Sequence, residues 1–117
     1  MNLIVPVDTA PEFEPRSVQV PPDRLLAGTP VCKGWELDEA KDGKVRTGIF
    51  SGTEGTNKSI KGEIFEFCHI IEGVVEITED GGKPMIFRAG DSFVMKPGFV
   101  GQWRTVEPFK KIYVVVE

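Results

Sequence analysis

The chain has 117 residues, of which 40% are hydrophobic and 27% are charged. This composition is typical of one soluble domain with a single modest core. The formal net charge is −4, and no stretch gathers Lys and Arg with aromatic side chains, which argues against a protein that binds the nucleic-acid backbone. The first residues have no basic start and are interrupted by Pro6, which argues against an export signal or a membrane span. We therefore expect a cytoplasmic protein that binds neither nucleic acid nor membrane.

Residues 1–30 are predicted to form a proline-rich N-terminal arm. Five prolines lie within residues 1–22, where they fix backbone angles and remove hydrogen-bond donors, so a helix or a central strand is excluded there. The arm is expected to wrap the surface or to lend an edge strand to a partner. Asp23–Gly28 predicts one short helical turn, with Asp23 as the N-cap and Gly28 as the stop. This is the only helix that the sequence predicts.

Residues 31–117 are predicted to form a single β-domain. Short apolar segments alternate with turn sequences such as Asp42-Gly43 and Pro97-Gly98, which supply the backbone angles that hairpins require. No helix-length periodic segment separates them, so a parallel α/β sheet is excluded and an all-β antiparallel sandwich or barrel is expected. The expected strands are residues 31–37, 45–51, 64–71, 74–78, 85–88, 92–96, 100–106 and 110–116.

The stretch Glu66–Gly73 is the centre of the predicted site. We expect a strand that ends in a tight turn at Gly73, with residues 74–78 returning beside it. Glu66 lies within an apolar and aromatic run, where ionisation costs more than in water and the pKa of a carboxyl group shifts. The sequence therefore predicts a pocket around Glu66.

Strand alternation limits which side chains share that pocket. If Glu66 points inward, Cys68 and Ile70 do so too, while Phe67 and His69 face the other way. Because this outer face is also apolar, we expect another layer, the arm or a second subunit to cover it. A homodimer with His69 at its interface is the simplest explanation.

Two segments resemble the signature motifs of the cupin superfamily. Glu66–Gly73 is similar to the first motif, and Gly90–Met95, followed by Pro97–Phe99, is similar to the second. Together with residues 98–103 and 106–113, the first segment also resembles a small subgroup, the ureidoglycine-aminohydrolase-like cupins. The resemblance implies a double-stranded β-helix, the cupin jelly-roll barrel. It also implies an aminohydrolase- or isomerase-like enzyme that acts on a small polar, nitrogen-containing metabolite.

The usual metal ligands of cupins are missing. The resemblance places a His-x-His pair within Ser59–Gly62 and a third histidine at Gly101, and none of these residues is histidine. Transition metals need three or more converging donors. Glu63 and His69 face away from Glu66 on an unbroken strand, so we expect no cofactor. A divalent transition metal is the alternative, and its ligands would be Glu66, Cys68 and Gln102.

The site hypothesis assigns Glu66 as a general acid or base. A purely structural alternative pairs Glu66 with Lys61 or Arg46, because a buried unpaired carboxylate is costly. Cys32 and Cys68 are far apart in the chain and are expected to be reduced thiols. The substrate-binding residues of the hypothesis are Trp103, Cys68, Phe93, Arg46 and Lys61.

Three functional hypotheses follow from these observations. The first is an enzyme that binds or transforms a small polar metabolite around Glu66, with Trp103 as the aromatic wall. The second is a metal-free barrel that binds or senses a small ligand. The third is a structural module that forms dimers and fills its barrel with side chains. A cavity of a few hundred Å³ would argue against the third hypothesis.

Overall fold

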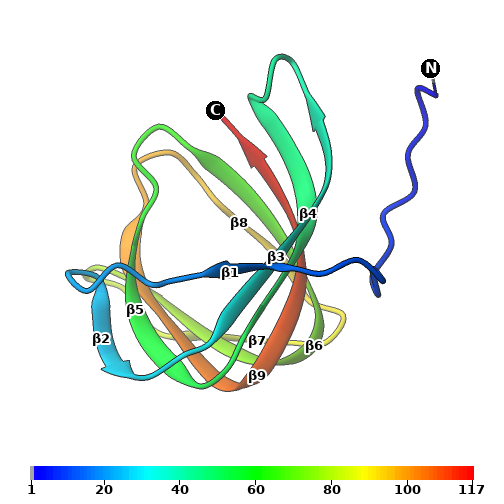
Figure 1. Cartoon of the computed structure of the whole chain (residues 1–117). Helices are drawn as coiled ribbons and strands as arrows, with labels where there is room; N and C mark the ends of the chain where they lie inside the picture. Colours follow the sequence, from blue (N-terminus) through cyan, green and yellow to red (C-terminus); the bar gives the residue numbers. More distant parts are fainter. Residues whose placement is uncertain (1) are drawn as a thin grey trace.

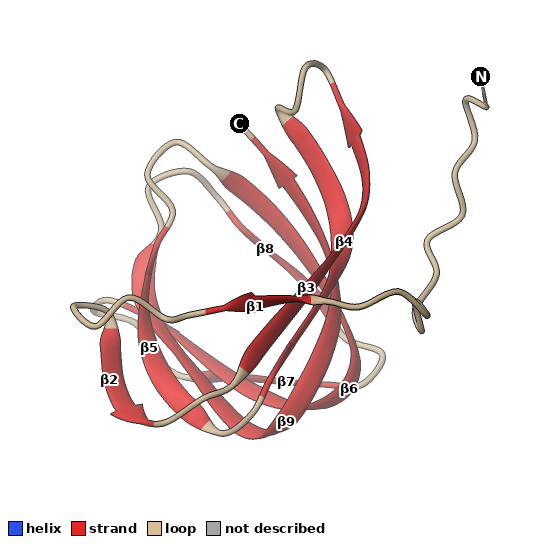
Figure 2. Ribbon diagram, in the orientation of Figure 1, coloured by secondary structure: helices blue, strands red, loops and turns tan. Residues whose placement is uncertain are grey.

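The structure, a computed structural model, describes residues 2–117 and contains nine strands and no helix within that range. The strands curl around a common interior, as Figure 1 shows in chain order and Figure 2 by type of element. A membrane-spanning helix is absent from the described part of the chain. The strands are β1 (Arg16–Val18), β2 (Leu25–Gly28), β3 (Cys32–Ala40), β4 (Val45–Gly52), β5 (Gly55–Ile60), β6 (Phe65–Glu79), β7 (Met85–Arg88), β8 (Ser92–Met95) and β9 (Val100–Val116).

All of these strands belong to one antiparallel sheet. Six of them follow the order β1-β3-β4-β9-β5-β2, and β6 pairs with the other side of β9. The first half of β6 also pairs with β8, and its second half pairs with β7. The two longest strands, β6 and β9, therefore hold the curled sheet together, and the predicted all-β fold is confirmed.

The tight turn predicted at Gly73 is wrong. Residues 65–79 form the continuous strand β6, which bends where its pairing with β9 shifts register between Ile70 and Val75. Gly73 has a φ of 90°, and a Cβ atom there would lie 2.1 Å from the carbonyl oxygen of Pro108. Glycine therefore permits the close approach of two bent strands instead of reversing the chain.

The short helix predicted for Asp23–Gly28 is also wrong. The N–H groups of Arg24 and Leu25 donate to the carbonyl oxygen of Pro21 at 2.8 and 3.1 Å, which closes a single turn. The chain then extends as β2 and pairs with β5. A helix this short forms few internal hydrogen bonds, so the open edge of β5 offers the backbone a better set of partners.

The N-terminal segment extends away from the barrel before β1 joins the edge of β3 (Figures 1 and 2). Leu3 and Ile4 are 91% and 86% exposed, so apolar side chains of this segment are uncovered in the single chain. Met1 lies outside the described residues. The homodimer, and the boundary between an arm of residues 1–30 and a barrel of residues 31–117, stay predictions.

The alternation predicted for β6 is confirmed. Cys68 and Ile70 are completely buried and Glu66 is 6% exposed, whereas Phe67 and His69 are only half-buried. The inward side chains of β6 meet those of β9 in the core, which places Glu66 at the wall of the barrel interior. The buried core cluster consists of Cys68, Ile70, Val75, Ile77, Met95, Trp103 and Phe109.

Candidate functional site

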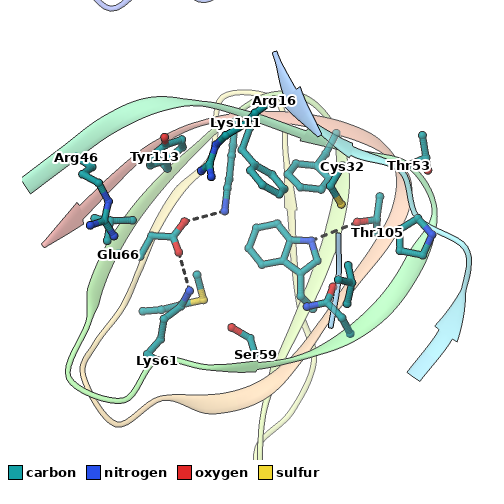
Figure 3. Close-up of a pocket in the computed structure, with 18 of the residues that line it drawn as sticks. Arg16, Cys32, Arg46, Thr53, Ser59, Lys61, Glu66, Thr105, Lys111 and Tyr113 are labelled. Atoms are coloured by element: carbon teal, nitrogen blue, oxygen red, sulfur yellow. Dashed lines mark hydrogen bonds and ion pairs between the residues drawn. The ribbon is translucent and has the colours of Figure 1, made fainter. Parts of the chain in front are cut away.

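A cavity of about 300 Å³ lies within the curled sheet, and Figure 3 shows the side chains around it. Strands from distant parts of the sequence line it, because β4, β5, β6 and β9 are neighbours in the sheet. Its charged lining residues are Arg16, Glu36, Arg46, Lys61, Glu66 and Lys111. Its aromatic lining residues are Phe50, Trp103, Phe109 and Tyr113.

Glu66 is held between two lysines. Nζ of Lys61, which directly follows β5, donates to Oε1 at 2.6 Å, and Nζ of Lys111 on β9 donates to Oε2 at 2.7 Å. The side chains of Glu66, Lys61 and Lys111 are 8%, 16% and 9% exposed. Each carboxylate oxygen thus accepts a charge-assisted hydrogen bond in a place that water barely reaches.

These charges determine the protonation states of the cluster. Burial by itself would raise the pKa of Glu66, but the positive charges of Lys111 and Lys61 outweigh it and lower the pKa from 4.5 to about 2. Burial would likewise lower the pKa of Lys111, but the negative charge of the Glu66 carboxylate beside it raises that pKa above its ordinary value. At neutral pH Glu66 is therefore a carboxylate and Lys111 an ammonium group.

Cys68 packs beside this cluster on β6. Its thiol donates to Oε2 of Glu66 at 3.2 Å, and Nζ of Lys111 lies 3.7 Å from the sulfur. Burial is the main cause that raises the pKa of Cys68 to about 12; the positive charge of Lys111 lowers it and the carboxylate of Glu66 raises it. At neutral pH the thiol is therefore protonated, and the reactive thiolate is scarce. The hydrogen bond from this thiol helps to hold the Glu66 carboxylate in place. Both Cys32 and Cys68 are free cysteines.

An aromatic wall adjoins the charged cluster. Nζ of Lys111 lies 4.4 Å from the ring centroid of Trp103 and 5.3 Å from that of Phe50, within the range of cation–π attraction. The indole N–H of Trp103 donates to Oγ1 of Thr105 at 3.2 Å, which fixes the plane of the ring. Figure 3 shows Thr105 on the opposite side of the cavity from Glu66.

The structure brings some of the predicted site residues together. Glu66, Lys61 and Trp103 line the same cavity. Arg46 also lines it but binds the carboxylate of Glu117 at 2.5 Å. Phe93 stacks on Phe87, with ring centroids 4.2 Å apart, and lines a neighbouring hollow that it shares with Phe87 and Met95. The functional roles assigned to these residues stay predictions.

Comparison with known families identifies the fold. The family model of the EutQ-like cupin domain matches residues 39–113. The chain belongs to this cupin family. The predicted cupin superfamily and its jelly-roll fold are thereby confirmed. Among curated proteins, none matches the sequence of this cupin.

Solved structures of low sequence identity share the cupin fold. A protein of unknown function from Pseudomonas syringae pv. tomato is 22% identical with a TM-score of 0.81, over 94% of this chain and 46% of that protein. The present chain thus spans about half of the length of the Pseudomonas protein. The EutQ protein of Clostridium difficile is 19% identical with a TM-score of 0.66, over 85% of this chain and 74% of that one. A putative ethanolamine utilization protein from Salmonella typhimurium is 20% identical with a TM-score of 0.64, over 74% and 69% of the two chains.

The residues of the cavity do not fit the metal ion that many cupins hold. Both oxygens of Glu66 accept hydrogen bonds from ammonium groups, and these two positive charges would repel a metal cation at this carboxylate. Gln102 is exposed on the other face of β9, and Nδ1 of His69 lies 2.7 Å from Oγ of Ser92. Within residues 2–117, no group of three or more His, Cys, Asp or Glu side chains is arranged to hold a metal ion.

Lys111 is the site residue that sequence reasoning missed. The sequence analysis placed it within the predicted strand of residues 110–116 and assigned it no role in the site. A signal was present, because Lys111 alternates with Phe109 and Tyr113, and all three are buried on the inner side of β9. A lysine between two inward aromatic residues indicates a buried cation that requires an acidic partner.

Proposed function

We propose that this cupin domain binds a small polar metabolite in the cavity around Glu66, without a metal ion. The observation that carries the proposal is the buried cluster of Glu66, Lys61 and Lys111 on the wall of a cavity of about 300 Å³. Ligand sites in proteins are typically cavities of this size or larger, with apolar walls and a few fixed polar groups. A cavity of this volume also argues against the filled-barrel hypothesis.

Stability alone does not account for the buried charges. Replacing a buried ion pair by well-packed apolar residues of similar volume is often neutral or stabilising, because removing charges from water costs several kcal/mol per ion. Three charged side chains beside Trp103 and Phe109 therefore stabilise the barrel wall less than apolar residues of similar volume could. Their position beside an open space supports a role in recognising a polar ligand.

In this proposal Glu66 positions the two lysines instead of exchanging protons. A general acid must carry its proton at the working pH, which a carboxyl group with a pKa of about 2 does not, and a carboxylate with so low a pKa is a weak general base. An enzyme that transforms the metabolite remains a second candidate, in which Lys61 and Lys111 would orient the substrate. The resemblance to the ureidoglycine-aminohydrolase-like cupins supports nitrogen-containing metabolites as the first compounds to test.

A metabolite screen tests the proposal. A panel of small polar metabolites is added to 15N-labelled protein, and binding is followed by the indole N–H signal of Trp103 and by thermal unfolding. We expect at least one compound to bind, with an affinity that a metal chelator leaves unchanged. A Ser59→Phe variant places a large ring in the cavity that Ser59 lines and should lose this binding while remaining folded. A transition metal present in a one-to-one ratio after purification without added metal would contradict the metal-free proposal, and failure of every compound to bind would overturn the ligand-binding function.

A further inference from the structure

The buried cluster carries more positive than negative charge. One carboxylate, that of Glu66, faces the two ammonium groups of Lys61 and Lys111, so the cluster has a net charge of +1. The three side chains are at most 16% exposed, so water screens this charge poorly. The excess has the opposite sign to the whole chain, whose formal net charge is −4. A desolvated net charge is costly without a partner of opposite sign, and an anion in the cavity would supply that partner.

The rim of the cavity does not cancel this excess. Arg46 lines the cavity and forms an ion pair with Glu117. Glu36 and Arg16 also line the cavity, are both exposed and carry opposite charges. The side-chain charges of these two arginines and two glutamates sum to zero. The positive charge of the cavity therefore comes from the inner cluster and is concentrated at one place on its wall.

Both lysines have donors left for a ligand. An ammonium group has three N–H donors. Within residues 2–117, Lys61 uses one of them on Glu66, whereas Lys111 uses one on Glu66 and makes a long contact of 3.7 Å to the sulfur of Cys68. Two donors of Lys61 and at least one of Lys111 are thus available to an acceptor in the cavity, which both lysines line.

The adjoining wall suits an apolar group. Trp103 and Phe109 line the cavity with their ring centroids 5.2 Å apart, and Phe50 completes the aromatic surface. Lys111 lies against Trp103, so the cationic and aromatic parts of the wall meet at this lysine. In Figure 3 Lys61 and Glu66 lie on one side of the cavity and Thr105, which holds the indole of Trp103, on the other. A ligand with a charged end and an apolar body can contact both sides.

Resting on the proposed function, we propose that the cavity selects small carboxylates with one negative charge and an apolar body. The carboxylate accepts hydrogen bonds from Lys61 and Lys111, and the apolar body packs against Trp103. A single negative charge matches the excess charge of the cluster, whereas a phosphate monoester carries nearly two charges. A cationic ligand would be repelled by two ammonium groups, and a neutral one would leave the excess charge uncompensated. Lys61 determines the specificity, because it has more free donors than Lys111.

Matched probes separate charge from shape. Benzoate, benzamide, benzylamine and phenyl phosphate share one ring and differ in the charge of the attached group. Their affinities are measured by isothermal titration and by the Trp103 indole signal, which is assigned with a Trp35→Phe variant because Trp35 and Trp103 are the only tryptophans. We expect benzoate to bind at least tenfold more tightly than each of the other three probes, because only benzoate carries the single negative charge that matches the cluster.

Lysine variants locate the carboxylate. Lys61→Met removes the ammonium group of a side chain that is 16% exposed, and we expect it to weaken benzoate binding at least tenfold with little effect on benzamide. Lys61→Arg keeps the charge and should retain most of the benzoate affinity, which guards against loss of binding through misfolding. Lys58→Met removes an exposed cation from the neighbouring strand β5 and is the matched control, with an expected change of less than about twofold.

The outcomes distinguish this inference from the proposed function. Equal or tighter binding of benzamide or benzylamine overturns the preference for anions and leaves a ligand-binding cavity. Tighter binding of phenyl phosphate overturns the assignment to carboxylates with one charge. Unchanged benzoate binding in Lys61→Met overturns the role of Lys61. If no probe binds at millimolar concentration while a metabolite of the earlier panel does, the inference fails and the proposed function stands.

Discussion

Replacing Glu66 by glutamine should destabilise the fold strongly, although the two side chains have nearly the same shape. Glutamine approximates the protonated carboxyl group, so the pKa of Glu66 gives the size of the effect. The difference between the ordinary value of 4.5 and the folded value of about 2 corresponds to about 3 kcal/mol, at about 1.4 kcal/mol for each pKa unit. Removal of one partner from a buried ion pair typically costs about 3–5 kcal/mol, which agrees with this figure.

The assay is urea unfolding at neutral pH, followed by circular dichroism. Glu66→Gln should lower the free energy of unfolding by about 3 kcal/mol, which corresponds to a decrease in Tm of roughly 10–15 °C for a domain of this size. Glu72→Gln is the matched control, because Glu72 is an exposed carboxylate of the same strand, and its effect should stay within about 0.5 kcal/mol. A second comparison replaces Glu66, Lys61 and Lys111 together by apolar residues and should recover most of the loss.

The reasoning is refuted if Glu66→Gln loses less than about 1 kcal/mol, or no more than Glu72→Gln does. In that case the two lysines would not depend on the carboxylate, and the cluster would not be the desolvated ion-paired unit that its exposure and short distances describe. A large loss that the triple apolar variant fails to recover would mean that packing around Glu66, and not its charge, accounts for the effect.

Two further predictions concern acid and backbone geometry. Because the pKa of Glu66 is lowered in the folded state, its stabilising effect is fully present above about pH 4.5 and is lost as the pH falls toward 2. The difference in unfolding free energy between the native protein and Glu66→Gln, measured by urea titration, should therefore shrink over this interval. A difference that stays constant would contradict the lowered pKa. Gly73→Ala should destabilise the barrel much more than Gly90→Ala, because both glycines have positive φ (90° and 94°) but only at Gly73 would a Cβ atom meet backbone, 2.1 Å from the Pro108 oxygen. Positive φ alone costs an alanine about 1–2 kcal/mol, and thermal unfolding that shows equal losses for the two variants would disprove the contact.

The failure at Gly73 illustrates the limit of local patterns. A glycine with positive φ is compatible with both a hairpin turn and a bend in a continuous strand. The choice between them depends on Pro108, which lies against Gly73 only after β6 has paired with β9. The two predicted segments on either side of Gly73 were correct as strands, and only their connection was wrong, because nothing within residues 64–78 specifies that distant partner.

The candidate site was predictable in part for the same reason. The partner Lys61 lies five residues from Glu66 and was considered from the sequence, whereas Lys111 lies 45 residues away. Arg46 was considered as another partner of Glu66, but it binds Glu117, which lies 71 residues further along the chain. Side-chain chemistry made each of these pairs plausible, and only the register of the strands selects among them.

The sequence by itself determined the all-β class, the cupin motifs and the inward direction of Glu66, Cys68 and Ile70, because alternation along a strand and turn chemistry are properties of neighbouring residues. The tertiary structure alone decided that β6 bends instead of reversing, that residues 25–28 join a sheet edge, and that Lys111 meets Glu66 beside Trp103. These outcomes depend on which strands pair and in what register. Pairing is settled by the burial and hydrogen bonding of the whole curled sheet, which no short segment contains.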